Sequence, residues 1–195
     1  MKNKLHLACG SVYLPDYENI DVYIKGQSFL ASERPDLVEQ NKTDWEHYYK
    51  DLIQKDDFLK GKFHKREIVC DSFADVRYLP FEPDSIQEIL GVQMFEHFSF
   101  REGEALLFNW YDLLIPGGKI HLDVPDIEGT MELYWKDKDW GTRLMFGSQK
   151  NEWGFHKAMY SPESLTKLLE KVGFRNIKIL PNIHTYPAFG ITGIK

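Results

Sequence analysis

Short apolar runs alternate with polar segments along the chain, and they predict strands separated by loops or helices. The runs stand at residues 4–8, 17–23, 66–70, 86–92, 119–124, 175–180 and 189–194. Short apolar runs bounded by Gly, Pro and Asp are typical of buried strands. The pattern therefore predicts seven strands.

Helical spacing of apolar residues marks the segments 44–53, 102–114 and 161–172. Asp44 is expected to cap the first, while the last begins at Ser161-Pro162 and ends at Gly173, which are usual start and stop residues. The connection between the first two strands is short, whereas a parallel crossover normally needs a dozen or more residues. We therefore expect the first helix to be reduced to a turn or absent.

Strands that alternate with helices or loops predict an α/β protein with a doubly wound, mostly parallel seven-stranded sheet. We expect one domain over residues 1–195, with insertions at about residues 25–65 and 127–158, since one domain is usual at this length. The second insertion is aromatic-rich and is expected to be irregular. Sites in such sheets lie at the carboxyl ends of the strands, so polar residues just after each strand are the candidates.

Composition narrows the class of partner. The formal net charge of −6 argues against nucleic acid, because phosphate groups call for a basic face. No apolar run approaches the ~20 residues that span a bilayer, and the first residues fit a strand better than a signal peptide. We expect a cytoplasmic protein without a membrane partner, in which Cys9 and Cys70 are reduced, buried thiols.

Small and acidic residues follow the first two predicted strands. Ala8-Cys9-Gly10 lets a ligand approach the backbone closely, because a larger side chain would collide with it. Asp21 can accept hydrogen bonds from both hydroxyls of a ribose. A tight turn alone would explain the first feature, and a single Asp at a strand end is common. The sequence contains no G-x-G-x-x-G and no P-loop pattern, which argues against a phosphate-bearing nucleotide.

Later segments give these features a context. Residues 75–81 read DVRYLPF, residues 93–97 read QMFEH, residues 114–120 read LIPGGKI, and residues 164–174 read SLTKLLEKVGF. This ordered series resembles the class I S-adenosylmethionine-dependent methyltransferases, specifically the small "type 11" group of predicted methyltransferases. The resemblance covers nearly the whole chain except about residues 25–65 and 127–153, and the Leu-Pro-Phe and Pro-Gly-Gly segments are its most diagnostic parts.

The resemblance implies S-adenosylmethionine as the cofactor and assigns residues to it. Ala8, Cys9 and Gly10 would pass beneath its methionine part, and Asp21 would hold the ribose hydroxyls. The carboxylate of Asp75 and the backbone of Val76 would meet the adenine, and Gln93 would lie beside the methionine part and the acceptor. Because this cofactor carries no phosphate, a reduced first helix is tolerable for it and damaging for NAD.

The chain departs from the family pattern at several strand-end positions. Ala8 and Val12 stand where glycine is usual, His6 stands where an acidic residue is frequent, and Gln93 replaces a frequent histidine. Ala8 adds only a methyl group, whereas Val12 changes the expected shape of the loop.

The implied reaction is methyl transfer to a small-molecule acceptor, such as a sugar or a surface-glycan precursor. A hydroxyl acceptor benefits from a general base, and His156, just before the last helix, is the first candidate, with Asp126 second. Each also has a structural reading, His156 as a loop anchor and Asp126 as a turn residue. His97 is expected to make a helix-start hydrogen bond, and no metal site is expected among the scattered histidines. The alternative function is a catalytically silent S-adenosylmethionine-binding sensor or scaffold.

Two further segments are candidates for the surroundings of the site. An aromatic series can line the acceptor pocket or pack as core; its members are Tyr134, Trp135, Trp140, Phe146, Trp153 and Phe155. The segment 45–58 is expected to cover the mouth of the site or to form a homodimer contact.

Overall fold

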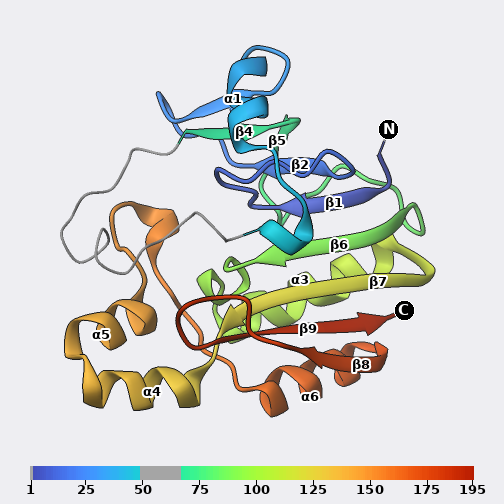
Figure 1. Ribbon diagram of the computed structural model, residues 1–195. Helices are drawn as coiled ribbons and strands as arrows, with labels where there is room; N and C mark the ends of the chain where they lie inside the picture. The colour runs from blue at the N-terminus through green and yellow to red at the C-terminus, as the bar shows by residue number, and fades with distance from the viewer. Residues whose placement is uncertain (1, 49–66) are drawn as a thin grey trace.

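The fold is built on a central sheet of seven strands in the order β5-β2-β1-β6-β7-β9-β8 (Figure 1). The computed structural model describes residues 2–48 and 67–195. The strands are β1 (Lys4–Leu7), β2 (Glu18–Asp21), β5 (Ser72–Phe73), β6 (Ile86–Val92), β7 (Leu114–Pro125), β8 (Arg175–Leu180) and β9 (Ala188–Ile194). Neighbouring strands are parallel except at β9, which is antiparallel to β7 and β8. The predicted mostly parallel seven-stranded α/β sheet is confirmed.

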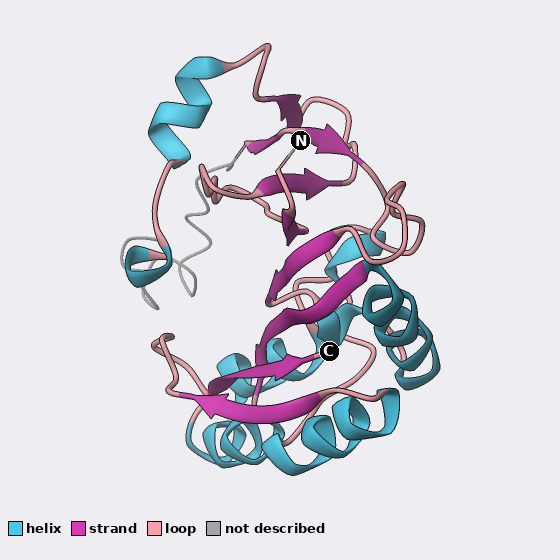
Figure 2. Ribbon diagram, turned by 90° about the vertical axis from the view of Figure 1, so that its right-hand side faces the viewer, coloured by secondary structure: helices cyan, strands magenta, loops and turns pink. Residues whose placement is uncertain are grey.

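Helices α3 (Phe100–Leu113) and α6 (Pro162–Val172) cover one face of the sheet (Figure 2). Leu107 and Trp110 of α3 and Leu165 of α6 are almost completely buried in the main core. Burial of such side chains stabilises the fold by about 1.5–3 kcal/mol each. The indole Nε1 of Trp110 also donates a hydrogen bond of 3.1 Å to the carbonyl of Val76. Helix α3 thereby holds the segment that follows β5 in place.

The opposite face of the sheet is contacted by the short 3₁₀ helix η1 (Trp45–His47). Trp45 and Tyr48 pack against Leu90 and Val92 of β6. Asp44 caps η1 by accepting a hydrogen bond from the backbone N–H of His47, so the predicted cap is present. The rest of the predicted helix 44–53 and most of segment 45–58 lie outside the described residues.

The prediction that the run 66–70 joins the main sheet is wrong. Strand β4 (Ile68–Cys70) pairs in parallel with β3 (Ser28–Leu30) in a separate two-stranded sheet, and the short β5 pairs with β2 instead. Leu37 of helix α1 (Pro35–Asn41) packs on this small sheet together with Val69. The apolar pattern identifies a strand but does not specify which strand it pairs with.

The prediction of an irregular segment at residues 127–158 is also wrong. The chain forms α4 (Ile127–Lys136), α5 (Lys138–Phe146) and the 3₁₀ helix η3 (Glu152–Gly154). Asp126 caps α4 and Asp137 caps α5, each through a side chain that accepts backbone N–H groups. These Asp residues are the start signals that the aromatic content of the segment obscured.

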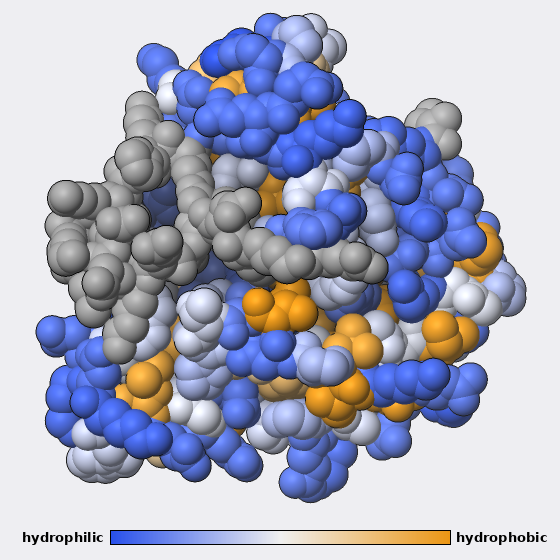
Figure 3. Space-filling view, in the orientation of Figure 1, coloured by the Kyte–Doolittle hydropathy of each residue, from blue (hydrophilic) through white to orange (hydrophobic). Residues whose placement is uncertain are grey.

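Hydrophilic side chains cover much of the face shown in Figure 3, above all where α1 lies at the top, and apolar residues stand out as separate spots. Among the helices formed by residues 2–48 and 67–195, none combines the length and apolar character needed to cross a bilayer.

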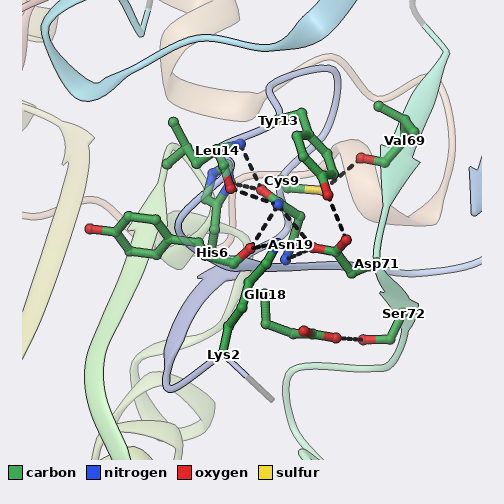
Figure 4. A network of polar contacts seen from close by, with 11 residues as sticks. Lys2, His6, Cys9, Tyr13, Leu14, Glu18, Asn19, Val69, Asp71 and Ser72 are labelled. Atoms are coloured by element: carbon green, nitrogen blue, oxygen red, sulfur yellow. Dashed lines mark hydrogen bonds and ion pairs between the residues drawn. The ribbon is translucent and has the colours of Figure 1, made fainter. Parts of the chain in front are cut away.

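Residues 8–17 connect β1 to β2 without a helix, as predicted, and buried side chains hold this loop (Figure 4). The amide of Asn19 donates to the carbonyls of Leu14 and Tyr17, and its Oδ1 accepts from the N–H of Leu14 at 3.0 Å. The same Oδ1 lies 2.9 Å from Nδ1 of His6, whose Nε2 lies 2.5 Å from the hydroxyl of Tyr48. Because Oδ1 only accepts, Nδ1 carries the proton and Nε2 accepts from Tyr48.

We predict that Asn19→Ala destabilises the protein by about 2–4 kcal/mol, because Leu14 loses its hydrogen-bond partners in a fully buried place. Urea unfolding measures the loss. Asn3→Ala, at an exposed position, is the control and should change the free energy of unfolding by less than about 0.5 kcal/mol. Equal effects of the two substitutions would contradict the role given to Asn19.

We also predict an acid-dependent loss of stability that comes from His6. Burial lowers the pKa of His6 to about 4, whereas the unfolded chain takes up the proton near its ordinary pKa of 6.5. The contribution of His6 is therefore complete above about pH 6.5 and is lost as the pH falls towards 4, by up to about 3 kcal/mol. Urea unfolding at pH 7, 5 and 4 should show a shallower pH dependence for His6→Gln than for the unmutated protein and the exposed control His47→Gln. Parallel curves for all three proteins would refute this prediction.

Candidate functional site

A pocket opens at the carboxyl ends of the neighbouring strands β1, β2, β5 and β6. Its wall is formed by Ala8, Asp21, Val22, Asp75, Val76, Met94, His97, Phe98 and Trp153. The structure thus brings together Ala8, Asp21, Asp75 and Val76 of the predicted cofactor residues. Cys9, Gly10 and Gln93 are not part of this wall.

The turn after β1 has an unusual backbone. Ala8 has φ +51° and Gly10 has φ +58°, a left-handed conformation that glycine adopts without strain. A side chain at Gly10 would meet open space, so backbone conformation and not room accounts for this glycine. Cys9 is not part of the pocket wall, and its Sγ lies 3.6 Å from the carbonyl of Val69. It and Cys70 are free and buried, as predicted.

Asp21 ends β2 and is held by two backbone donors. The N–H groups of Gly10 and Val22 each lie 2.7 Å from one of its carboxylate oxygens. Burial raises the pKa of Asp21, while these two hydrogen bonds act in the opposite direction. Each oxygen can still accept a further hydrogen bond. Asp21 therefore offers the pocket a pair of adjacent, fixed acceptors.

Asp75 follows β5 and forms an ion pair with Arg77. Its Oδ1 accepts from the backbone N–H and from Nε of Arg77, both at 2.9 Å. The hydrogen bond from the Arg77 side chain is the main reason why the pKa of Asp75 is lowered, so this carboxylate is charged at neutral pH. The guanidinium lies 6.0 Å from the ring centre of Trp153, a residue of the pocket wall.

Gln93 lies at the end of β6 and contacts a pair that the sequence analysis missed. Its Nε2 donates to Oδ1 of Asp123 at 2.8 Å, and Nε2 of His184 lies 2.5 Å from the same oxygen. Asp123 is 1% exposed. A charged residue inside the apolar run of β7 is a sequence signal that could have identified Asp123. No sequence pattern connects Asp123 with His184, which lies 61 positions away.

A second group of ionisable side chains lies beside the pocket. Nε2 of His97 and Nε2 of His156 each lie 3.8 Å from Oε1 of Glu96, and the two imidazole rings meet edge to face at 4.8 Å. We call Glu96, His97 and His156 the Glu-His-His cluster. His97 is the last residue of the 3₁₀ helix η2 (Phe95–His97) and is part of the pocket wall. The role expected from the sequence, a hydrogen bond at a helix start, does not predict this position.

Burial controls the charge of this cluster. It raises the pKa of Glu96 to about 8 and lowers the pKa of His97 to about 4. It also lowers the pKa of His156, against a hydrogen bond to the carbonyl of Leu144. No group within the described ranges donates a hydrogen bond to either oxygen of Glu96. Such an orphaned buried carboxylate is costly.

Main-chain contacts bring His156 to Glu96. The carbonyl of Glu96 accepts hydrogen bonds from the N–H groups of Lys157 and Ala158 at 2.8 and 3.1 Å. The imidazole Nδ1 of His156 lies 2.7 Å from the carbonyl of Leu144, so Nδ1 carries the proton and Nε2 has the lone pair. The predicted base thus anchors its loop and also faces a buried carboxylate.

Asp126 has a structural role, and only part of the aromatic series reaches the pocket. Asp126 uses its carboxylate to cap α4, accepting from the N–H groups of Glu128 and Gly129, and it lies outside the pocket wall. Of the aromatic series, Trp153 lines the pocket, Trp140 is buried and Trp135 is 75% exposed. The series is therefore not one continuous wall.

No protein-family model matches the sequence, and no curated protein matches it. The structure, in contrast, is similar to solved S-adenosylmethionine-dependent methyltransferases. One from Methanosarcina mazei has a TM-score of 0.55 and 14% identity over 100% of this chain and 94% of that chain. One from Thermotoga maritima has a TM-score of 0.51 and 16% identity over 99% of this chain and 82% of that chain.

The human N-acetylserotonin methyltransferase, solved in complex with S-adenosylmethionine, has a TM-score of 0.53 and 14% identity, over 98% of this chain and 47% of that chain. These likenesses extend over nearly the whole chain. The predicted resemblance is confirmed for the fold, while membership of the "type 11" group stays a prediction. The chain has the fold of the class I S-adenosylmethionine-dependent methyltransferases.

Proposed function

We propose that the protein binds S-adenosylmethionine in this pocket and transfers its methyl group to a small acceptor. The observation that carries the proposal is the convergence of the Ala8–Gly10 turn, Asp21 and Asp75 at one edge of the sheet. Ligands of open α/β sheets bind at this edge. Residues 8–17 hold no helix whose N-terminus can receive a phosphate, which favours a cofactor without one.

The cofactor's parts have partners along the pocket. Asp21 presents two fixed carboxylate oxygens to the ribose hydroxyls, and Asp75 with the backbone of Val76 meets the adenine. The carboxylate of Asp75 thus bonds to both Arg77 and the adenine. The methionine part extends past the Ala8–Gly10 turn towards Gln93.

The reaction is an in-line displacement at a sulfonium. The bond from sulfur to the methyl carbon breaks as the acceptor's oxygen or nitrogen bonds that carbon, and the acceptor's proton passes to a base. Alignment of the two partners supplies several kcal/mol of the rate enhancement. The half-exposed ring of Trp153 at the pocket provides a face on which a sugar or another ring can stack; a sugar or glycan-precursor acceptor in the cytoplasm stays a prediction.

His156 is favoured over Asp126 as the base. The lone pair on its Nε2 is available in the tautomer set by Leu144, whereas both carboxylate oxygens of Asp126 cap α4. His156 also lies next to His97, which is in the pocket wall.

We predict that Asp21→Ala weakens S-adenosylmethionine binding by about 1.5–3 kcal/mol, roughly 10- to 150-fold, because hydrogen bonds to a charged group are lost. Isothermal titration calorimetry measures the affinity, and Asp16→Asn, at an exposed position, is the control that should bind like the unmutated protein. Failure of the unmutated protein to bind the cofactor at all would refute the proposed function.

We predict that His156→Ala lowers turnover by about 10²–10⁴-fold, as expected for loss of a general base, and leaves cofactor affinity nearly unchanged. A screen of sugars, nucleotides and amines with product detection supplies the acceptor, and the exposed His47→Ala is the control. Turnover within about threefold of the unmutated protein would remove His156 as the base. Tight cofactor binding without turnover on any acceptor would support a silent sensor or scaffold.

A further inference from the structure

We propose that the Glu-His-His cluster is a binding site for one divalent transition-metal ion, formed by Glu96, His97 and His156. From the sequence alone no metal site is expected, because the histidines are scattered along the chain. Metal binding by the cluster can be measured without cofactor or acceptor, although it would occupy Nε2 of His156, the base of the proposed methyl transfer.

The three side chains of the cluster place their ligand atoms close to one another. The Nε2 atoms of His97 and His156 are both 3.8 Å from Oε1 of Glu96, and one ligand atom from each residue lies within 4.8 Å of the others. A tetrahedral ion with bonds of about 2.0–2.1 Å needs ligand atoms roughly 3.3 Å apart. Small side-chain rotations therefore close the cluster around an ion.

The carboxyl group of Glu96 is buried without a hydrogen-bond donor in the described parts of the chain. The side chain of Glu96 is 1% exposed, and neither oxygen has a hydrogen-bond donor among the groups of residues 2–48 and 67–195. A buried charge without a partner is unfavourable unless a proton or a cation neutralises it. A metal ion bound here would supply the positive charge that neutralises the ionised carboxylate.

The imidazole of His156 is oriented as in a metal ligand. Its Nδ1–H donates to the backbone carbonyl of Leu144 at 2.7 Å, which leaves the lone pair of Nε2 on the side of Glu96. Histidines that bind metals almost always donate their other ring N–H in this way. The N–H groups of Lys157 and Ala158 bond to the carbonyl of Glu96, so the ligands from two distant segments are fixed to each other by the main chain.

The donor set indicates the kind of ion. Two imidazoles and one carboxylate suit Zn²⁺, Co²⁺ or Fe²⁺, whereas Mg²⁺ and Ca²⁺ prefer oxygen ligands. Three protein ligands leave a coordination position open. His97 is part of the pocket wall, so the cluster borders the pocket proposed for the cofactor. An ion there and a proton on Nε2 exclude each other, so metal-bound His156 would act as a ligand and not as the base.

The test is a titration of the metal-free full-length protein, dialysed against a chelator, with CoCl₂ in the absence of cofactor and acceptor. We expect one equivalent of Co²⁺ to give visible absorption bands without a thiolate charge-transfer band, since no cysteine belongs to the cluster, and Zn²⁺ to displace it. Glu96→Gln and His156→Gln should each weaken binding by at least about tenfold. The matched control is His121→Gln, which changes another buried histidine outside the cluster and should bind like the unmutated protein.

Melting temperatures separate loss of the site from loss of the fold. Glu96→Gln keeps the side-chain volume and replaces the buried carboxyl by a neutral amide, so the metal-free variant should melt close to the unmutated protein. Zn²⁺ should raise the melting temperature of the unmutated protein and of His121→Gln, but not of Glu96→Gln. Absence of Co²⁺ binding, or binding that Glu96→Gln and His156→Gln leave unchanged, would overturn the proposal. Cofactor binding, measured separately by calorimetry on the metal-free protein, shows whether the proposed function stands independently of that result.

Discussion

The connection from β1 to β2 contains no helix, so the backbone groups of residues 8–17 need partners from elsewhere. Buried side chains of β2 supply them: Asn19 bonds to both backbone groups of Leu14, and Asp21 accepts from the N–H of Gly10. The carboxylate of Asp21 also lines the pocket. The support of the loop and the acceptor proposed for the ribose are therefore the same group, and a change that loosens one alters the other.

Two buried carboxyl groups, Asp21 at the end of β2 and Glu96 after β6, illustrate different solutions to the cost of burial. Burial raises the pKa of both Asp21 and Glu96. Asp21 is stabilised by two backbone N–H groups, whereas Glu96 has no donor in the described parts of the chain and faces two histidines. Natural proteins seldom retain an unsatisfied buried carboxylate without a functional reason, which is why the cluster carries the metal proposal.

Local signals in the sequence determined the type and order of most elements. Apolar runs bounded by turn residues located β1, β2, β6 and β7, and the short connection before β2 correctly predicted the missing helix. Ser161, Pro162 and Gly173 correctly bounded α6. These features depend on neighbouring residues, because caps and hydrophobic periodicity act over a few positions. Ala8 and Asp21 could be identified from the sequence as site residues, since the carboxyl ends of parallel strands share one edge of the sheet, whereas Asp75 came from the family resemblance.

Only the tertiary structure decided which distant groups meet. The run that ends at Cys70 pairs with β3 and not with the main sheet, because the partner of a strand depends on how the chain crosses over. Asp123 meets His184 across 61 positions, and Glu96 meets His156 through main-chain hydrogen bonds to the segment that follows α5. The sequence by itself determined most strands of the main sheet, the caps of α6 and the shared edge of the sheet. The burial of Glu96, the approach of His156 and the resulting pKa changes required the folded chain, since proximity and desolvation arise only when distant segments pack together.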